Sequence, residues 1–134
     1  MAYLAVALGG ALGACLRFLV GEWIGTIGGF PVATLLINVS GSFFLAWFYT
    51  LTAERLPIHP TLRVGIGTGF VGAFTTFSTF TVEIWDLYKA GDVWMAISYL
   101  LISAVGGLLA ALFGYWVAQR QARLAISTDV GEEL

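Results

Sequence analysis

The chain has 134 residues and a formal net charge of −2, with 59% hydrophobic and only 10% charged residues. Its mean hydropathy of +0.90 excludes an ordinary soluble domain and predicts an integral membrane protein. Because about 20 apolar residues cross the hydrocarbon core as one helix, the chain has room for four spans and little else. The predicted fold is all-α, in a lipid bilayer and without a nucleic acid partner.

Four apolar stretches alternate with three short connections along the chain. The predicted spans are residues 4–23, 32–51, 62–87 and 93–117, and the connections are residues 25–31, 54–61 and 89–92. An even number of spans places both termini on one side of the membrane. The first span is expected to be retained, because no basic residue precedes it as in a signal peptide. Residues 1–124 then form one transmembrane domain, and residues 125–134 form an acidic tail to which we assign no function.

The basic residues give only a weak preference for one orientation. Those on the side of the termini are Arg55, Arg63, Arg120 and Arg123, and those on the other side are Lys89 and, more loosely, Arg17. Positive charge favours the cytoplasmic side, and a difference of four against two is small. The sequence therefore permits insertion in both directions.

Arg17 is a cation within a first span that is rich in small residues. Gly9 and Gly13 belong to a glycine stripe that lets helices approach closely. Arg17 either snorkels toward the membrane surface or lines a water-filled anion vestibule. Cys15 has no second cysteine to pair with, and His59 lies far in sequence from any serine that it could activate. Enzymatic activity is therefore not expected.

Thr34, Asn38 and Ser42 are spaced by four residues and share one face of the second span. A carboxamide within the membrane is costly unless its amide hydrogens and its oxygen find partners. Asn38 is therefore either a clasp between helices or a donor to a passing anion. The residues alone leave both roles open.

The third span contains hydroxyl groups and phenylalanine rings in unusual density. Residues 72–80 read Gly-Ala-Phe-Thr-Thr-Phe-Ser-Thr-Phe, and three further glycines precede them. Because hydroxyls offer alternative partners to backbone groups, we expect a break in the helix between Gly72 and Thr76. Carbonyls exposed at such a break are suited to coordinating sodium.

Aromatic and polar side chains follow the expected break. Phe77 and Phe80 lie on one helical flank, and Glu83 comes after them. Such phenylalanines usually only pack, but the edges of their rings are positive and can stabilise a small anion weakly. Weak, multiple contacts permit conduction. In the fourth span, Tyr99 and Ser103 are one turn apart and continue a face of hydrogen-bond donors.

At these residues the chain resembles the Fluc fluoride channels, also called the CrcB family, over all four spans. The resemblance rests on Gly-Ala-Cys-Leu-Arg ending at Arg17, on Asn38, and above all on residues 72–80 followed by Glu83. It implies a small bacterial inner-membrane channel that assembles as an antiparallel homodimer with dual topology. It also implies two fluoride pathways and a central sodium ion that is structural and is not transported.

The resemblance assigns roles to individual residues. The expected fluoride pathway comprises Arg17, Asn38, Phe77, Thr79, Phe80, Glu83, Tyr99 and Ser103, and the backbone carbonyls of Gly72 and Thr75 are expected to hold the sodium. In some relatives a further serine follows one turn after Ser103, but this chain has Gly107 there. A carboxylate such as that of Glu83 beside an anion route must be protonated, hydrogen-bonded or turned aside.

The implied function is passive export of cytoplasmic fluoride down its electrochemical gradient, which gives fluoride resistance. Two alternatives remain open. A small multidrug-type, proton-coupled exporter also has four short spans, but it needs an acidic residue in the middle of the first span, and Glu22 lies at the end. A noncatalytic assembly subunit would leave the cluster at residues 72–80 without a purpose.

Overall fold

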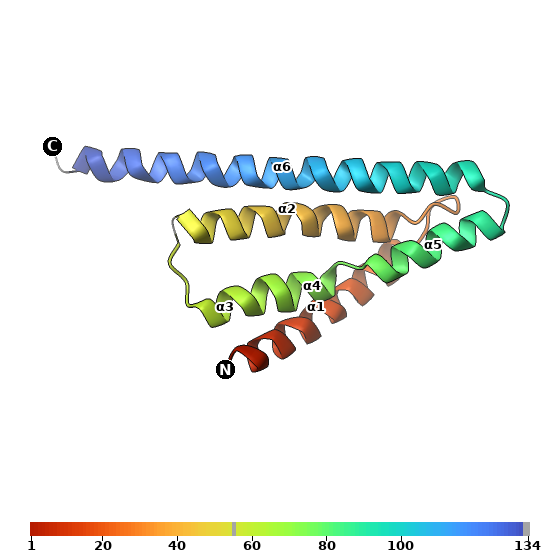
Figure 1. Cartoon of the computed structure of the whole chain (residues 1–134), viewed down its shortest axis with the longest axis horizontal. Coiled ribbons are helices and arrows are strands. Elements are labelled where there is room, and N and C mark those ends of the chain that lie inside the picture. Colours follow the sequence, from red (N-terminus) through yellow and green to blue (C-terminus); the bar gives the residue numbers. More distant parts are fainter. Residues whose placement is uncertain (55, 133–134) are drawn as a thin grey trace.

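The computed structural model describes residues 1–54 and 56–132, and the side chains of residues 1–53 and 56–122. Nearly all of this part is helical (Figure 1). The elements in chain order are α1 (Ala2–Ile24), α2 (Val32–Glu54), α3 (Pro60–Val64), η1 (Gly65–Val71), α4 (Gly72–Phe74), α5 (Phe77–Lys89) and α6 (Val93–Glu132). Arg55 and the side chain of Arg123, two of the basic groups expected on the side of the termini, lie outside the described residues, as does the end of the acidic tail.

Three helices are long and apolar enough to cross a membrane. These helices are Ala2–Ile24, Val32–Ala53 and Val93–Ala122, which correspond to the predicted first, second and fourth spans. The backbone of α6 stays helical to Glu132, well beyond the predicted end at residue 117, because a helix does not have to end where its apolar run ends. The beginning of α1 and the described end of α6 lie toward the same end of the molecule (Figure 1).

The third apolar stretch is broken, which confirms the expected interruption. Helix α4 ends at Phe74, and the next two residues are extended, with φ −75° and ψ 157° at Thr75 and φ −147° and ψ 123° at Thr76. Helix α5 then begins at Phe77. The half before the break packs against α1, and the half after it packs against α6 (Figure 1). The break therefore lets one stretch of chain join two helix pairs.

A π-helical segment before the break was not predicted from the sequence. In η1 the backbone is wider than in an α-helix, and the Gly72 N–H at its end donates to the carbonyls of Gly67 and Gly69. Gly67 lies against the ring and hydroxyl of Tyr49, so a larger residue there would collide with that side chain. Glycine makes both the wide turn and the close contact possible.

Small residues set the distances between the main helices. A Cβ added at Gly13 of α1 would collide with the carbonyl oxygen of Phe70, and one added at Gly114 of α6 would collide with that of Phe43 in α2. Such backbone contact is typical of membrane helices, where close approach replaces the hydrophobic effect. The predicted small-residue stripes therefore serve packing.

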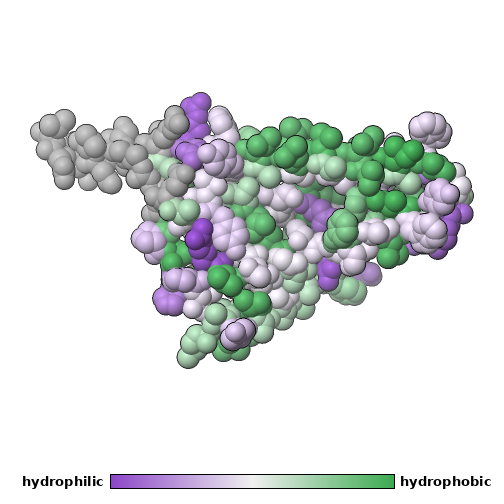
Figure 2. Space-filling view, viewed as in Figure 1, coloured by the Kyte–Doolittle hydropathy of each residue, from purple (hydrophilic) through white to green (hydrophobic). Residues whose placement is uncertain are grey.

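Much of the apolar surface remains uncovered in the single chain. Figure 2 shows hydrophobic residues along α6, while hydrophilic residues gather mainly at the two ends of the molecule. Only 6% of the most apolar part of α1 and 11% of that of α6 is buried by the rest of the chain. Lipid or another protein surface must cover the remainder, because exposed apolar patches of this extent do not face water.

Candidate functional site

Asn38 of α2 pairs with the backbone at the break. The Thr76 N–H donates to Asn38 Oδ1 at 2.9 Å, and Asn38 Nδ2 donates to the Thr76 carbonyl oxygen at 2.9 Å. The carboxamide thus satisfies both backbone polar groups of Thr76, a residue that has left the helix, as a neighbouring strand would. Asn38 therefore acts as a clasp, and one of its two amide hydrogens is still available to another acceptor.

One carbonyl before the break, that of Gly72, loses its helical hydrogen bond. In a continuous helix the Thr76 N–H would donate to the Gly72 carbonyl, but here it donates to Asn38. The Thr75 N–H and Thr75 Oγ1 both donate to the carbonyl of Val71, at 2.9 and 3.0 Å. The Gly72 carbonyl consequently lacks its helical donor. The described residues contain no cluster of three or more His, Cys, Asp or Glu side chains, so a cation held here would depend on carbonyl oxygens such as this one.

The hydroxyl cluster caps the first turn of α5. Thr76 Oγ1 accepts from the Thr79 N–H at 3.2 Å, and it donates to Thr79 Oγ1 at 2.9 Å. The Ser78 hydroxyl lies 3.4 Å from Thr76 Oγ1. These contacts supply the partners that hydroxyls need away from water, and Ser78 and Thr79 remain exposed in the single chain. The break therefore presents the amino end of a helix together with exposed hydroxyls.

Glu83 is held by two hydroxyl groups from different helices. Thr34 Oγ1 donates to Glu83 Oε1 at 2.8 Å, and the Tyr99 hydroxyl donates to Glu83 Oε2 at 2.7 Å. Thr34 is 5% exposed and Tyr99 is completely buried. Of the three possibilities considered for this side chain, hydrogen bonding is the one that the geometry provides. Both carboxylate oxygens are engaged by donors instead of facing an anion.

Aromatic rings surround Tyr99 and continue toward the break. The ring of Phe80 lies 5.1 Å from that of Tyr99 at an interplanar angle of 61°, and Phe30 lies 5.4 Å away at 78°. Both are edge-on arrangements. Phe77 and Phe80 are neighbours at 6.0 Å, and Phe77 is 79% exposed. Phe30, in the loop before α2, was missed in the sequence, because nothing in its surroundings there links it to Tyr99.

A hollow of about 550 Å³ is lined by charged and hydroxyl-bearing residues. Its walls include Arg17, Thr34, Thr76, Ser78, Thr79 and Glu83. Arg17 is half-buried there and makes no ion pair with any side chain in the described part of the chain. Of the two roles considered for Arg17, lining a polar vestibule is the one that this position suits.

A second hollow, of about 260 Å³, opens on the other side of the Asn38 clasp. It is lined by Asn38, Gly41, Ser42, Leu45, Thr75, Thr76 and Phe77. Ser103, expected to lie farther along the same track, is on α6, and its Oγ is buried without a hydrogen-bond partner in the part of the chain that the structure describes. A buried hydroxyl of this kind is uncommon and leaves one donor for a group from outside the chain.

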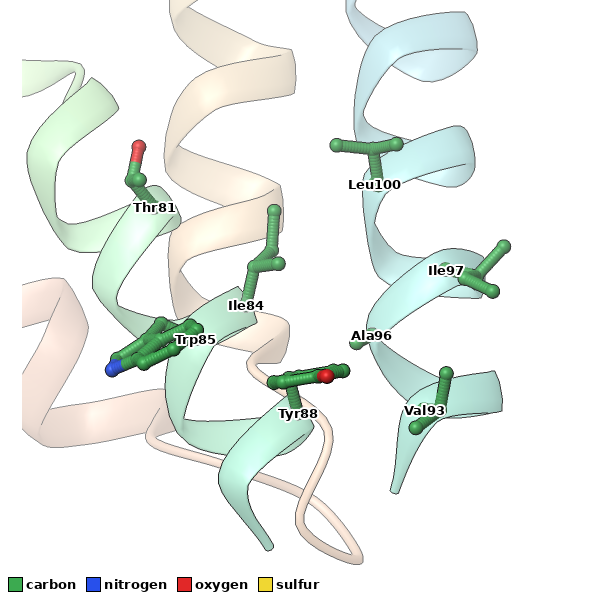
Figure 3. Close-up of a pocket in the computed structure, with 8 residues that line it drawn as sticks. All are labelled: Thr81, Ile84, Trp85, Tyr88, Val93, Ala96, Ile97 and Leu100. Carbon is green, nitrogen blue, oxygen red and sulfur yellow. The ribbon is translucent and has the colours of Figure 1, made fainter. Parts of the chain in front are cut away.

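An apolar hollow of about 390 Å³ lies between α5 and α6, away from these polar residues. It is lined by Thr81, Ile84, Trp85, Tyr88, Val93, Ala96, Ile97 and Leu100 (Figure 3). The side chains belong to two neighbouring helices and are almost entirely aromatic or aliphatic. This hollow suits hydrocarbon and offers little to an ion.

A protein-family model described as CrcB-like protein, Camphor Resistance (CrcB), matches residues 4–115. The match runs from α1 into α6 and includes every residue of the candidate site. Among curated proteins, the chain is 47% identical over 114 residues to Fluoride-specific ion channel FluC 2 of Listeria innocua, covering 85% of this chain and 88% of that protein. It is 43% identical over 128 residues to Fluoride-specific ion channel FluC 2 of Geobacillus kaustophilus, covering 94% and 99%. A protein of the same name from Carboxydothermus hydrogenoformans is 46% identical over 114 residues, covering 85% and 84%.

Proposed function

Because the chain belongs to the CrcB-like family, we propose that it is a fluoride-selective ion channel of the bacterial plasma membrane. It crosses the membrane several times, and as a channel it catalyses no chemical reaction. Fluoride leaves the cytoplasm passively, down its electrochemical gradient, and the cell gains resistance to fluoride. The curated relatives described above carry the name of fluoride channels, which supports this function over the multidrug-type exporter.

The observation that carries the proposal is the break in the third span, where Asn38 pairs with the backbone of Thr76. A small anion must exchange its hydration shell for protein donors that hold it weakly enough to let it leave. The break supplies the amino end of α5, the Thr79 hydroxyl and the second amide hydrogen of Asn38. Phe77 and Phe80 add ring edges beside these donors. None of these groups is a lysine that would trap the ion.

The two hollows suit the two ends of such a path. Arg17 in the larger hollow attracts anions from water, and Glu83 in the same wall is held in place by the hydroxyls of Thr34 and Tyr99, which donate to its oxygens. The smaller hollow continues past Asn38 to Phe77. The track then follows α6 to Ser103, whose buried hydroxyl has no hydrogen-bond partner among the described residues.

Two copies of the chain are proposed to form the working channel, as an antiparallel homodimer. In each copy the broken stretch serves as a fourth span beside α1, α2 and α6. The exposed apolar surface of a single chain and the exposure of Phe77 support a second copy that completes the walls of the path. A weak charge bias is compatible with insertion in both directions.

A structural sodium ion is proposed where the breaks of the two copies meet. The fit rests on the Gly72 carbonyl, which has lost its helical donor, and on the carbonyl of the extended Thr75 beside it. Two carbonyls from each copy would give four oxygen ligands on the symmetry axis. The ion would supply a fixed positive charge that holds the two breaks together, and it is not transported.

An efflux assay tests the proposed function. Purified protein is reconstituted into liposomes loaded with fluoride or chloride, and release is followed with ion-selective electrodes. Fluoride should leave far faster than chloride, without ATP and without a proton gradient. Equal rates for the two anions would contradict selectivity, and dependence on a proton gradient would favour a coupled exporter.

A further inference from the structure

Helices α2 and α6 pack against each other and run in the same direction (Figure 1). The polar face of each helix steps by four residues, with Thr34, Asn38 and Ser42 on α2 and Tyr99, Ser103 and Gly107 on α6. Equal steps on parallel helices place these residues at three successive levels. At the first level, Thr34 and Tyr99 donate to the same carboxylate, that of Glu83.

The third level differs from the other two because Gly107 has no side chain. A Cβ added at Gly107 would have Ser42 Oγ as its nearest neighbour, at 3.6 Å, which is an ordinary van der Waals contact. The hydroxyl at this level therefore comes from α2 and faces the position where α6 has none. Ser42 also lines the smaller hollow together with Asn38 and Phe77.

We propose that Ser42 is a further residue of the fluoride pathway, which supplies the hydroxyl that α6 lacks at Gly107. The inference rests on the proposed channel function and adds a residue outside the set expected from the sequence. It makes the path continuous from the Asn38 clasp to the level beyond Ser103.

The hydroxyl of Ser42 is free to turn toward an anion. In the structure Ser42 Oγ donates to the Asn38 carbonyl at 2.8 Å. That carbonyl also receives the helical N–H four residues later, so it keeps a donor when the hydroxyl rotates away. The change of partner therefore leaves no backbone group unsatisfied, and the serine exchanges one acceptor for another.

A substitution with a built-in rescue tests this role. Ser42→Ala removes the hydroxyl, and fluoride efflux from liposomes should fall about tenfold, the effect expected for one hydrogen bond to a charged group. Ser42→Ala combined with Gly107→Ser returns a hydroxyl to the same level from the opposite helix, and most of the flux should return. The contact at 3.6 Å indicates that a Cβ at position 107 fits.

Ser40→Ala is the matched control. Ser40 lies on the same helix and its Oγ donates to the Ile37 carbonyl at 3.2 Å, but it does not line the smaller hollow. This variant should conduct like the wild type, and all variants should elute as the wild type does in size-exclusion chromatography.

Each other outcome decides against the proposal. Unchanged flux in Ser42→Ala would overturn the role of Ser42 while leaving the channel function intact. Loss of flux without rescue by Gly107→Ser would show that Ser42 only packs, and it would overturn the role equally. A wild-type protein that moves no fluoride would instead remove the channel function on which the inference rests.

Discussion

Asn38→Asp is the sharpest test of the site, because it replaces the side-chain NH₂ group by an oxygen and hardly changes the shape of the side chain. Asn38 Nδ2 donates to the Thr76 carbonyl at 2.9 Å, whereas an ionised carboxylate has no hydrogen to donate. The substitution therefore removes one hydrogen bond, leaves a buried acceptor unsatisfied, and places two oxygens against each other. The Thr76 N–H keeps its bond to the remaining oxygen.

The size of the effect follows from two contributions. A buried acceptor left without its donor costs about 1–3 kcal/mol. A carboxylate within a membrane-spanning helix costs about 2.5–3.5 kcal/mol on insertion scales. At about 1.4 kcal/mol per factor of ten, the first cost makes the paired break about 5- to 100-fold rarer. The second cost lowers the stability of the inserted helix whether or not the break is paired. A fixed negative charge beside the path would repel fluoride as well.

Fluoride efflux from liposomes measures the result, with a potassium ionophore present to balance charge. Flux through Asn38→Asp should drop to the background of protein-free liposomes. Thr52→Val is the control, because Thr52 lies on the same helix and its hydroxyl donates only to the backbone carbonyls of Phe48 and Tyr49. If Asn38→Asp elutes normally and still conducts like the wild type, the pairing with Thr76 has no role in conduction and the reasoning fails.

Three further predictions address the rings, the packing and the assembly. Phe77→Ile and Phe80→Ile keep bulk but lose the positive ring edge, so each should lower fluoride flux about tenfold without changing elution; wild-type flux in both would contradict an aromatic role. Gly114→Ala should lower the free energy of unfolding in detergent by about 1–3 kcal/mol, because the added Cβ collides with the Phe43 backbone. Gly106→Ala places its Cβ 3.4 Å from a Val39 methyl group and should be nearly neutral. Equal losses of stability in the two variants would contradict the packing argument. Cysteine labelling in cells should find the carboxyl terminus on both sides of the membrane, and sodium should support flux without accompanying fluoride; one orientation throughout, or coupled sodium flux, would refute the antiparallel dimer with its structural ion.

Local features of the sequence predicted the helices and the break well. Apolar runs of membrane length predicted α1, α2 and α6, and the glycine and hydroxyl residues between Gly72 and Thr76 predicted where the third stretch would open. The reason is that both depend on short-range chemistry: backbone groups in lipid must bond within the helix, and hydroxyls offer them another partner. The π-helical segment was not predicted, because the apolar and glycine pattern of residues 65–71 does not distinguish a π-helical turn from an α-helical one.

Contacts between residues that are far apart in the sequence could not be predicted from it. Asn38 and Thr76 are 38 positions apart, so the clasp remained one of two possibilities until the helices were in place. Glu83 is likewise satisfied by Thr34, 49 positions earlier, and by Tyr99 on another helix. Periodicity had placed Thr34 and Asn38 on one face of α2, but only the packing of α5 and α6 identifies what that face meets.

The pairing of Asn38 with Thr76 also bears on how the chain matures in the membrane. Before α2 is in place, lipid offers the Thr76 N–H and carbonyl no substitute partner, so the third stretch is better satisfied as an unbroken helix. The opening of the third stretch therefore depends on α2 being docked beside it, and the two helices are expected to reach their final shape together.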